Sequence, residues 1–386
     1  MNYKLTSTSW DEEEINAIND VIKSGQFSMS ANVFEFEKHF ASFVNSKYCV
    51  MVNSGSSANL LMIAAMFFRK NNPLKRGDEV IVPAISWSTT YSPLQQYGLH
   101  VKFIDIDKNT LNINLESLKT AITEKTKAIL LVNLLGNPND FDKIKEIIGD
   151  RNIEILEDNC ESMGAEYEGK QAGSFGLMGS FSCFYSHHIS TMEGGLIVTG
   201  NEELHHILLA LRAHGWTRNL PEKNYLCEKN PDPFIEHFRF LIPGYNVRPL
   251  EMSGAIGIKQ LKKLPNMINI RRKNAEIFHN YFQNNDNFFI QKEIGKSSWF
   301  GFAITIKPES KLKRCDIINV LTENNIDTRP IVTGDMTKCE MLKYFDYSLH
   351  GKMNNAKLIN DNGFFVGNHD FILEKEIKLL YNILSF

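Results

Sequence analysis

The chain has 386 residues, of which 43% are hydrophobic and 23% are charged, and its formal net charge is −3. This length predicts one large domain plus a smaller one, and the balanced charge argues against nucleic acid as a partner. The N-terminal stretch lacks the apolar core of a signal peptide. No run approaches the roughly 20 apolar residues of a membrane span, so we expect a cytoplasmic protein that does not enter the membrane.

The predicted elements begin with a helix near Ser9, where Ser9-Trp10-Asp11-Glu12 fits a capping box before a periodic apolar set. Short apolar runs then alternate with helical patterns up to about residue 200. The expected strands are Tyr48–Val52, Val80–Pro83, Val101–Ile106, Ala128–Leu134, Ile153–Glu157, Gly179–Phe184 and Leu196–Thr199. Helical patterns between them include Ala58–Arg69, Leu115–Ala121 and Asp142–Ile148. This alternation predicts an α/β domain with a mixed, mostly parallel sheet.

The pattern changes after residue 250. A helix at Met252–Leu261 leads into a long basic helix that contains Arg271, and a strand-like run at Trp299–Ile306 and a helical tail follow. We therefore predict a large domain over residues 1–250 and a smaller α+β domain over residues 251–386. The N-terminal helix is expected to pack with the smaller domain.

The six cysteines are scattered along the chain. They are Cys49, Cys160, Cys183, Cys227, Cys315 and Cys339, and none forms a CxxC pair or another tight cluster. Neither a metal site nor a disulfide framework is therefore predicted, and an iron–sulfur cluster lacks its usual closely spaced ligands.

Three stretches follow predicted strands and could hold a ligand. Asn53-Ser-Gly-Ser-Ser-Ala-Asn59 opens a helix, where serines and free N–H groups could bind a phosphate, or it is an ordinary N-capped turn. Glu157-Asp-Asn-Cys-Glu161 puts carboxylates at a strand end, either to hold a protonated ring nitrogen or to cap a turn. Trp87 could stack on a planar cofactor, although a single tryptophan is more often part of a core.

The pair His187-His188 is the most unusual feature, because it lies between an apolar strand and the turn Glu193-Gly-Gly195. Metal ligation by both is disfavoured, since neighbouring side chains of an extended chain point in opposite directions and no third ligand is evident nearby. No lysine occurs between Lys170 and Lys223.

Two later segments are rich in polar side chains. In Gly244-Tyr-Asn-Val-Arg-Pro249, Asn246 and Arg248 could contact an anion or cap the backbone. The stretch from Arg212 to Arg218 is either a substrate-phosphate site or a helix C-terminus with a glycine stop.

Taken in order, these stretches resemble the sugar aminotransferase family of fold-type I pyridoxal phosphate enzymes, nearly from end to end. In that family a lysine six residues before the Glu of Glu-Gly-Gly binds the cofactor covalently. Counting back from Glu193 reaches His187, whereas counting forward from Tyr185 favours His188. One branch of the family carries the histidine pair, and segments around Tyr185-Ser-His-His188 and His214-Gly-Trp-Thr-Arg218 resemble that branch, in which the first histidine is the base.

The resemblance implies the fold-type I architecture and a set of roles. Asp158 would pair with the pyridine nitrogen, Trp87 would stack on the ring, and Glu161 would lie close to it. Ser56, Ser57 and Ser182 would hold the phosphate. Asn246 would reach the cofactor of the neighbouring subunit, so the site would need a homodimer. Arg218 and Arg329 are the expected contacts to the diphosphate or sugar of the substrate.

The same resemblance implies the chemistry. With His187 as base, pyridoxal or pyridoxamine phosphate binds without a covalent bond, and L-glutamate regenerates the pyridoxamine form. A nucleotide 4-keto-6-deoxy sugar, most simply the GDP-linked sugar of colitose biosynthesis, loses its C3 hydroxyl, and ammonia is released.

Three alternatives stay open on the sequence alone. The first is a CDP-sugar 3-dehydrase, whose branch also has paired histidines but carries an iron–sulfur cluster and uses a reductase. The second is an aminotransferase that recruits Lys170 or Lys223. The third is a non-catalytic relative that binds a sugar nucleotide or the cofactor.

Overall fold

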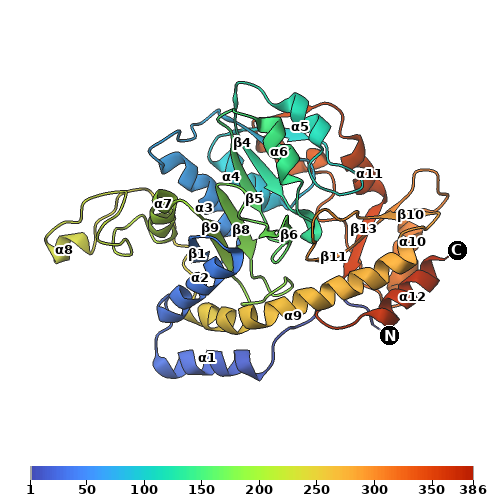
Figure 1. Ribbon diagram of the computed structural model, residues 1–386, viewed down its shortest axis with the longest axis horizontal. Coiled ribbons are helices and arrows are strands. Elements are labelled where there is room, and N and C mark those ends of the chain that lie inside the picture. Colours follow the sequence, from blue (N-terminus) through green and yellow to red (C-terminus); the bar gives the residue numbers. More distant parts are fainter. Residues whose placement is uncertain (1, 386) are drawn as a thin grey trace.

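The computed structural model describes residues 2–385, in which one long helix joins two main sheets, and a two-stranded sheet is added to them (Figure 1). The larger sheet has eight strands in the order β1-β9-β8-β5-β4-β2-β3-β12. They are β1 (Tyr48–Val52), β9 (Gly195–Thr199), β8 (Met178–Ser182), β5 (Glu154–Asp158), β4 (Thr126–Val132), β2 (Glu79–Pro83), β3 (His100–Ile104) and β12 (Tyr347–His350). Strand β9 is antiparallel to both neighbours, and the other pairings are parallel. The predicted mixed, mostly parallel sheet is confirmed.

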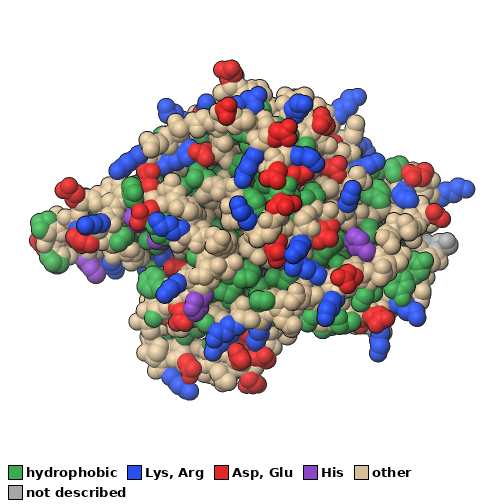
Figure 2. All heavy atoms as spheres, in the orientation of Figure 1, with side chains coloured by type: hydrophobic (Ala, Val, Ile, Leu, Met, Phe, Trp, Pro, Cys, Tyr) green, Lys and Arg blue, Asp and Glu red, His purple; other side chains and the backbone are tan. Residues whose placement is uncertain are grey.

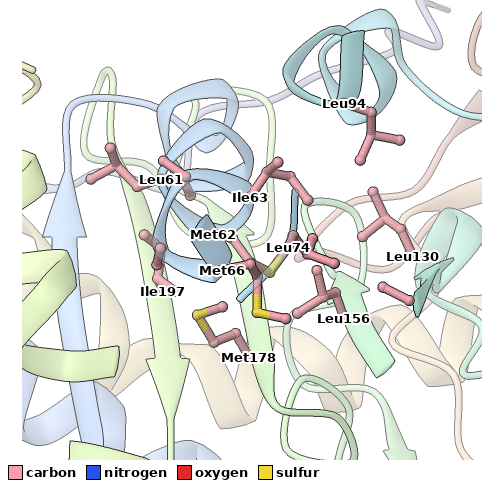
Figure 3. Close-up of a cluster of buried hydrophobic side chains, with 14 of the residues drawn as sticks. Leu61, Met62, Ile63, Met66, Leu74, Leu94, Leu130, Leu156, Met178 and Ile197 are labelled. Atoms are coloured by element: carbon pink, nitrogen blue, oxygen red, sulfur yellow. The ribbon is translucent and has the colours of Figure 1, made fainter. Parts of the chain in front are cut away.

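Helices cover both faces of this sheet. Successive side chains of a strand point to opposite faces, so each strand contributes apolar side chains to the packing on both faces. On one face, Val80, Leu130 and Leu156 pack in a cluster with α3 (Gly55–Phe68), α4 (Ser88–Gln96) and α7 (Glu202–Arg212), part of which Figure 3 shows. On the other face, Ile81 and Ile129 pack with α5 (Leu115–Ala121) and α6 (Phe141–Ile148). Burial on both faces explains why these strands are apolar throughout.

The smaller sheet is antiparallel and contains β10 (Phe288–Ile290), β11 (Gly301–Ile306) and β13 (Gly363–Gly367). Helices α10 (Arg314–Glu323) and α12 (Glu374–Leu384) bury apolar side chains in the same cluster as this sheet. The long helix α9 (Glu251–Phe282) connects the two sheets (Figure 1). Helices α1 (Glu12–Ser24) and α2 (Ala31–Val44) pack along α9.

The remaining elements are short. They are β6 (Glu166–Tyr167), β7 (Lys170–Gln171), α8 (Pro233–Glu236), α11 (Asn354–Asn362) and the 3₁₀ turns η1 (Leu134–Gly136), η2 (Met336–Lys338) and η3 (Glu340–Tyr344). Within residues 2–385, no helix combines the length and apolar character needed to cross a membrane.

The start of the first helix was predicted wrongly. Helix α1 begins at Glu12, and its capping box joins Asp11 and Glu14. Ser9 instead donates a hydrogen bond to Gln260 Oε1 on α9 at 2.7 Å. Serine and aspartate are equally good N-caps, so the local pattern could not choose between them, whereas the contact with α9 uses the Ser9 hydroxyl.

The predicted division near residue 250 falls at the start of α9. The domain boundary stays a prediction, because β12 comes later in the chain than residue 250 and nevertheless pairs with β3 in the large sheet. The two helical patterns predicted after residue 250 form the single helix α9.

Candidate active site

The carboxyl ends of parallel strands bring the predicted residues together. Trp87 follows β2, Asp158 ends β5, and Ser182 ends β8, beside the start of α3. These elements surround a cavity of about 320 Å³. The predicted site residues that line it are Ser56, Trp87, Asp158, Glu161, Ser182, His187 and Arg329. Arg329 reaches it from the segment whose backbone pairs with Phe365 of β13.

Asp158 contributes a carboxylate that is only 4% exposed. Its Oδ2 accepts hydrogen bonds from Asn59 Nδ2 at 2.8 Å and Thr90 Oγ1 at 2.7 Å, and its Oδ1 accepts from the backbone N–H of Cys160 at 3.1 Å. All three donors are uncharged. Because a buried charge is costly without a charged partner, a protonated ring nitrogen in the cavity would be stabilised here.

The N-terminus of α3 has the features of an anion-binding turn. Ser54 caps the helix by accepting the Ser57 N–H at 3.1 Å, and Ser56 Oγ forms a hydrogen bond with Thr89 Oγ1 at 2.9 Å. The first N–H groups of a helix have no partner within the helix and favour a negative charge. Ser57 itself does not line the cavity, and its hydroxyl donates to Asn53 Oδ1 at 2.7 Å.

Trp87 supplies an aromatic surface at the cavity, and its side chain is 48% exposed. The cavity therefore combines a buried carboxylate, a flat ring and a helix N-terminus, which are the groups that a pyridine ring carrying a phosphate requires. These residues fit pyridoxal phosphate.

The two histidines lie in different surroundings. His187 lines the cavity and is half-buried, whereas His188 is 2% exposed and contacts the Ser298 carbonyl. Burial lowers the pKa of His187 to about 3, and the charges of Arg329 and Arg271 act in the same direction. A neutral imidazole can therefore accept a proton inside the cavity.

The cavity lining, within residues 2–385, includes no lysine. Lys170 lies exposed on β7 and Lys223 lies exposed after α7, so neither is in place to hold an aldehyde in this site. In the same described part of the chain, no three His, Cys, Asp or Glu side chains gather as a possible metal site.

The two glutamates of the strand-end motif have different environments. Glu161 lines the cavity and accepts the Leu135 N–H at 3.1 Å, and burial raises its pKa to about 7. Glu157 accepts backbone N–H groups of Gly173, Phe175 and Gly176, each at 2.7 Å, and it holds that loop. Only Glu161 is placed to meet a ligand.

Besides Ser57, two predicted residues lie outside this cavity, Asn246 and Arg218. Asn246 is exposed and accepts from Arg248 Nε at 3.0 Å. Arg218 is exposed, lies 4.0 Å from the ring centroid of Trp216, and donates to the His237 carbonyl. The stretch from Arg212 to Arg218 has the form of a helix C-terminus followed by a glycine, one of its two interpretations from the sequence. Helix α7 ends at Arg212, and Gly215 follows with a φ of 79°.

Sequence reasoning assigned no role to Asn59, Thr90 or Phe300. The first two orient Asp158; Asn59 is the last residue of the motif Asn53–Asn59, and Thr90 lies three residues after Trp87. Phe300 lines the cavity from the start of β11, and no local motif marks it. Only the packing of the two sheets brings it there.

Residues 8–381 match the DegT/DnrJ/EryC1/StrS aminotransferase family, and the chain belongs to this family. Among its relatives, GDP-4-keto-6-deoxy-D-mannose 3-dehydratase of Yersinia pseudotuberculosis is 61% identical over 387 residues, covering 100% of this chain and 98% of that protein. Two solved structures of GDP-4-keto-6-deoxymannose-3-dehydratase have a TM-score of 0.98 at 59% identity, covering 100% of both chains. One is a histidine-to-asparagine mutant with bound GDP-perosamine, and the other contains a trapped PLP–glutamate geminal diamine.

The lowered pKa of His187 predicts an acid-sensitive protein with a neutral cavity histidine. In ¹³C NMR of the folded apoenzyme, with His187→Asn used for assignment, His187 should show no titration midpoint near 6.5. The unfolded chain protonates its histidines below about 6.5, so the free energy of unfolding should fall as the pH drops through that value. A His187 midpoint close to that of the denatured protein would contradict this electrostatic environment.

Proposed function

We propose that this chain is a pyridoxal phosphate-dependent 3-dehydratase that converts GDP-4-keto-6-deoxy-D-mannose to GDP-4-keto-3,6-dideoxy-D-mannose. The observation that carries the proposal is the neutral imidazole of His187 in a cavity that has the other groups of a pyridoxal phosphate site and no lysine among its described lining residues. The 61% identity to the Yersinia dehydratase supports the substrate. The product would be a precursor of colitose, and we assign the enzyme to cytoplasmic lipopolysaccharide biosynthesis.

The cofactor is held without a covalent bond. When bound in its pyridoxamine form, it would supply an amine that condenses with the 4-keto carbon, and the electron pair of its methylene C–H bond would expel the C3 hydroxyl. Asp158 keeps the ring nitrogen protonated, Trp87 covers the ring, and Ser56 and Ser182 bind the phosphate at the α3 N-terminus.

His187 is the residue that moves protons. Its neutral ring would accept, at a ring nitrogen, the proton that the methylene of the pyridoxamine form gives up, and the resulting imidazolium would pass that proton to the leaving C3 oxygen. Phe184 and Phe300 lie against this ring, with centroids 5.8 and 5.1 Å away, and they limit the access of water to it. An imidazole cannot replace the amine of a lysine in binding an aldehyde, so the reaction ends in a deoxy sugar rather than an amino sugar.

The overall reaction balances without an external reductant. L-Glutamate gives up its amino group and becomes 2-oxoglutarate, and the sugar loses one oxygen atom. Each turnover therefore consumes one glutamate and one keto sugar, and it releases one ammonium ion, one 2-oxoglutarate and one dideoxy sugar.

Turnover of purified protein with pyridoxal phosphate, L-glutamate and the GDP-linked keto sugar tests this function. We expect equal amounts of ammonium, 2-oxoglutarate and 3-deoxy product, and His187→Asn should lower the rate by about 10² to 10⁴-fold because the proton-transfer group is lost. His39→Asn is the matched control, since His39 is exposed on α2 and does not line the cavity.

Three outcomes would contradict the proposal. An amino sugar product would indicate an aminotransferase, and faster turnover of the CDP-linked sugar would indicate the other nucleotide. Failure of glutamate to remove the aldehyde absorption band of the cofactor, with no ammonium formed, would indicate a binding protein.

We further propose that the enzyme is a homodimer whose two sites are shared. Helix α8 and the loops on either side of it project from the body of the chain as an arm (Figure 1). Hydrophobic side chains gather at its far end (Figure 2), where Phe234 is 81% and Phe238 is 62% exposed. Large apolar side chains of this kind are typical of interfaces, so this arm is suited to pack on a second copy. Asn246 follows the arm and is exposed, as a group that serves the partner's cofactor must be.

A mixing experiment tests the shared site. His187→Asn and Asn246→Ala chains should each be nearly inactive, and a co-refolded equal mixture should regain about a quarter of wild-type activity. Half of the dimers are then hybrids, each with one site that has both intact residues. A mixture no more active than its components, or a monomer in light scattering, would contradict sharing.

A further inference from the structure

His188 has a defined hydrogen bond but no place in the cavity. It is 2% exposed, it is absent from the cavity lining, and its Nε2 lies 3.1 Å from the Ser298 carbonyl oxygen. A carbonyl oxygen only accepts, so Nε2 carries the hydrogen and donates it. Burial, together with the charge of Arg271, lowers the pKa of His188 and keeps the ring neutral. His188 therefore acts as a fixed donor rather than as a second base.

The segment that receives this hydrogen bond is strained. Trp299 has a φ of 46° and Leu135, in the facing turn, has a φ of 52°, and side chains at such angles cost on the order of 1 kcal/mol or more each. Backbone hydrogen bonds join the two segments, from Ser298 N–H to the Gly136 carbonyl at 2.9 Å and from Phe300 N–H to the Leu135 carbonyl at 3.0 Å. Such conformations persist only where the surroundings hold them.

Side chains from three parts of the chain hold this segment in place by donating hydrogen bonds to the carbonyls of residues 298–300. Asn368 Nδ2 donates to the Trp299 carbonyl at 2.9 Å, and Arg271 of α9 donates to the Phe300 carbonyl at 3.2 Å. His188 donates to the Ser298 carbonyl, and among these three donors it alone comes from the loop that also carries His187. It thus ties the cavity loop directly to the strained segment.

The side chain that this segment delivers to the cavity is Phe300. Its ring centroid lies 5.1 Å from that of His187, at an interplanar angle of 65°, and 5.8 Å from that of His188. Phe184 contacts His187 as well, at 5.8 Å. The orientation of the His187 ring and its contact with water therefore depend on where Phe300 is held.

We propose that His188 is a positioning residue, whose Nε2–H bond to the Ser298 carbonyl holds Phe300 against the imidazole of His187. The inference rests on the proposed function in taking His187 as the base. In this role His188 takes no part in the proton transfer itself and acts through residues 298–300.

Two substitutions that differ in the length of the new side chain test the hydrogen bond. The side-chain amide nitrogen of His188→Gln can take the place of Nε2, whereas that of His188→Asn ends near the position of Nδ1 and cannot reach the Ser298 carbonyl. We expect His188→Asn to lower kcat by about ten- to a hundredfold with KM little changed, because a misplaced catalytic group affects the chemical step. His188→Gln should restore most of this loss.

A second readout needs neither cofactor nor substrate. In ¹³C NMR of the apoenzyme, the His187 midpoint should move up toward 6.5 in His188→Asn and in Phe300→Leu, and it should stay low in His188→Gln. Arg329 and Arg271, the charged groups that act on His187, are retained in all three variants. The double variant His188→Asn/Phe300→Leu should be no worse than either single one, since both changes remove the same contact.

The outcomes separate this inference from the proposed function. Equal impairment of His188→Gln and His188→Asn with an unchanged His187 titration would overturn the positioning role, as would wild-type behaviour of His188→Asn. If His188→Asn does not fold by circular dichroism, Phe300→Leu and His188→Gln carry the test with the same expected results. A shifted His187 titration in a protein without dehydratase activity would refute the proposed function and support the positioning role.

Discussion

At residue 187 the cavity wall carries an imidazole, which can move protons but cannot bind an aldehyde covalently as a lysine amine does. In the proposed function the cofactor is therefore held by non-covalent contacts alone, which we assign to the Asp158 carboxylate, the Trp87 ring and the N-terminus of α3. Asp158 suits that duty because it is 4% exposed and receives only uncharged donors. A cationic ring nitrogen would supply the charge that this buried carboxylate lacks.

The part of the chain around the small sheet contributes further side chains to the cavity. The ends of β2, β5 and β8 carry the groups that we propose for the cofactor, whereas Phe300 and Arg329 approach the cavity from the segments around β11 and β13. Glu161 lies where the two parts meet, with its carboxylate bound by the Leu135 N–H of the strained turn. The same turn is hydrogen-bonded to residues 298–300, so one backbone network contacts Glu161 and also holds Phe300, which lies against His187.

Local sequence patterns predicted the large sheet well, because its strands are apolar on both faces and end in recognisable turns. The strand at Tyr48–Val52 has the predicted bounds, and Asp158 and Trp87 lie at strand ends as expected. The patterns could not choose between Ser9 and Asp11 as an N-cap, and residue counting could not separate His187 from His188. Phe300, Arg271 and β12 could not be foreseen, since their positions depend on contacts between segments far apart in the chain. The roles of the site residues stay predictions.

Reduction with borohydride tests the central claim most directly. Protein loaded with pyridoxal phosphate is treated with borohydride and analysed by mass spectrometry of the intact chain and its peptides. The account predicts no pyridoxyl group on any lysine of the wild-type chain, and a covalent adduct in the positive control His187→Lys, where an amine is placed in the cavity wall. An adduct on Lys170, Lys223 or another lysine of the wild-type chain would contradict the account, because the cofactor would then be covalently held and an aminotransferase would be expected.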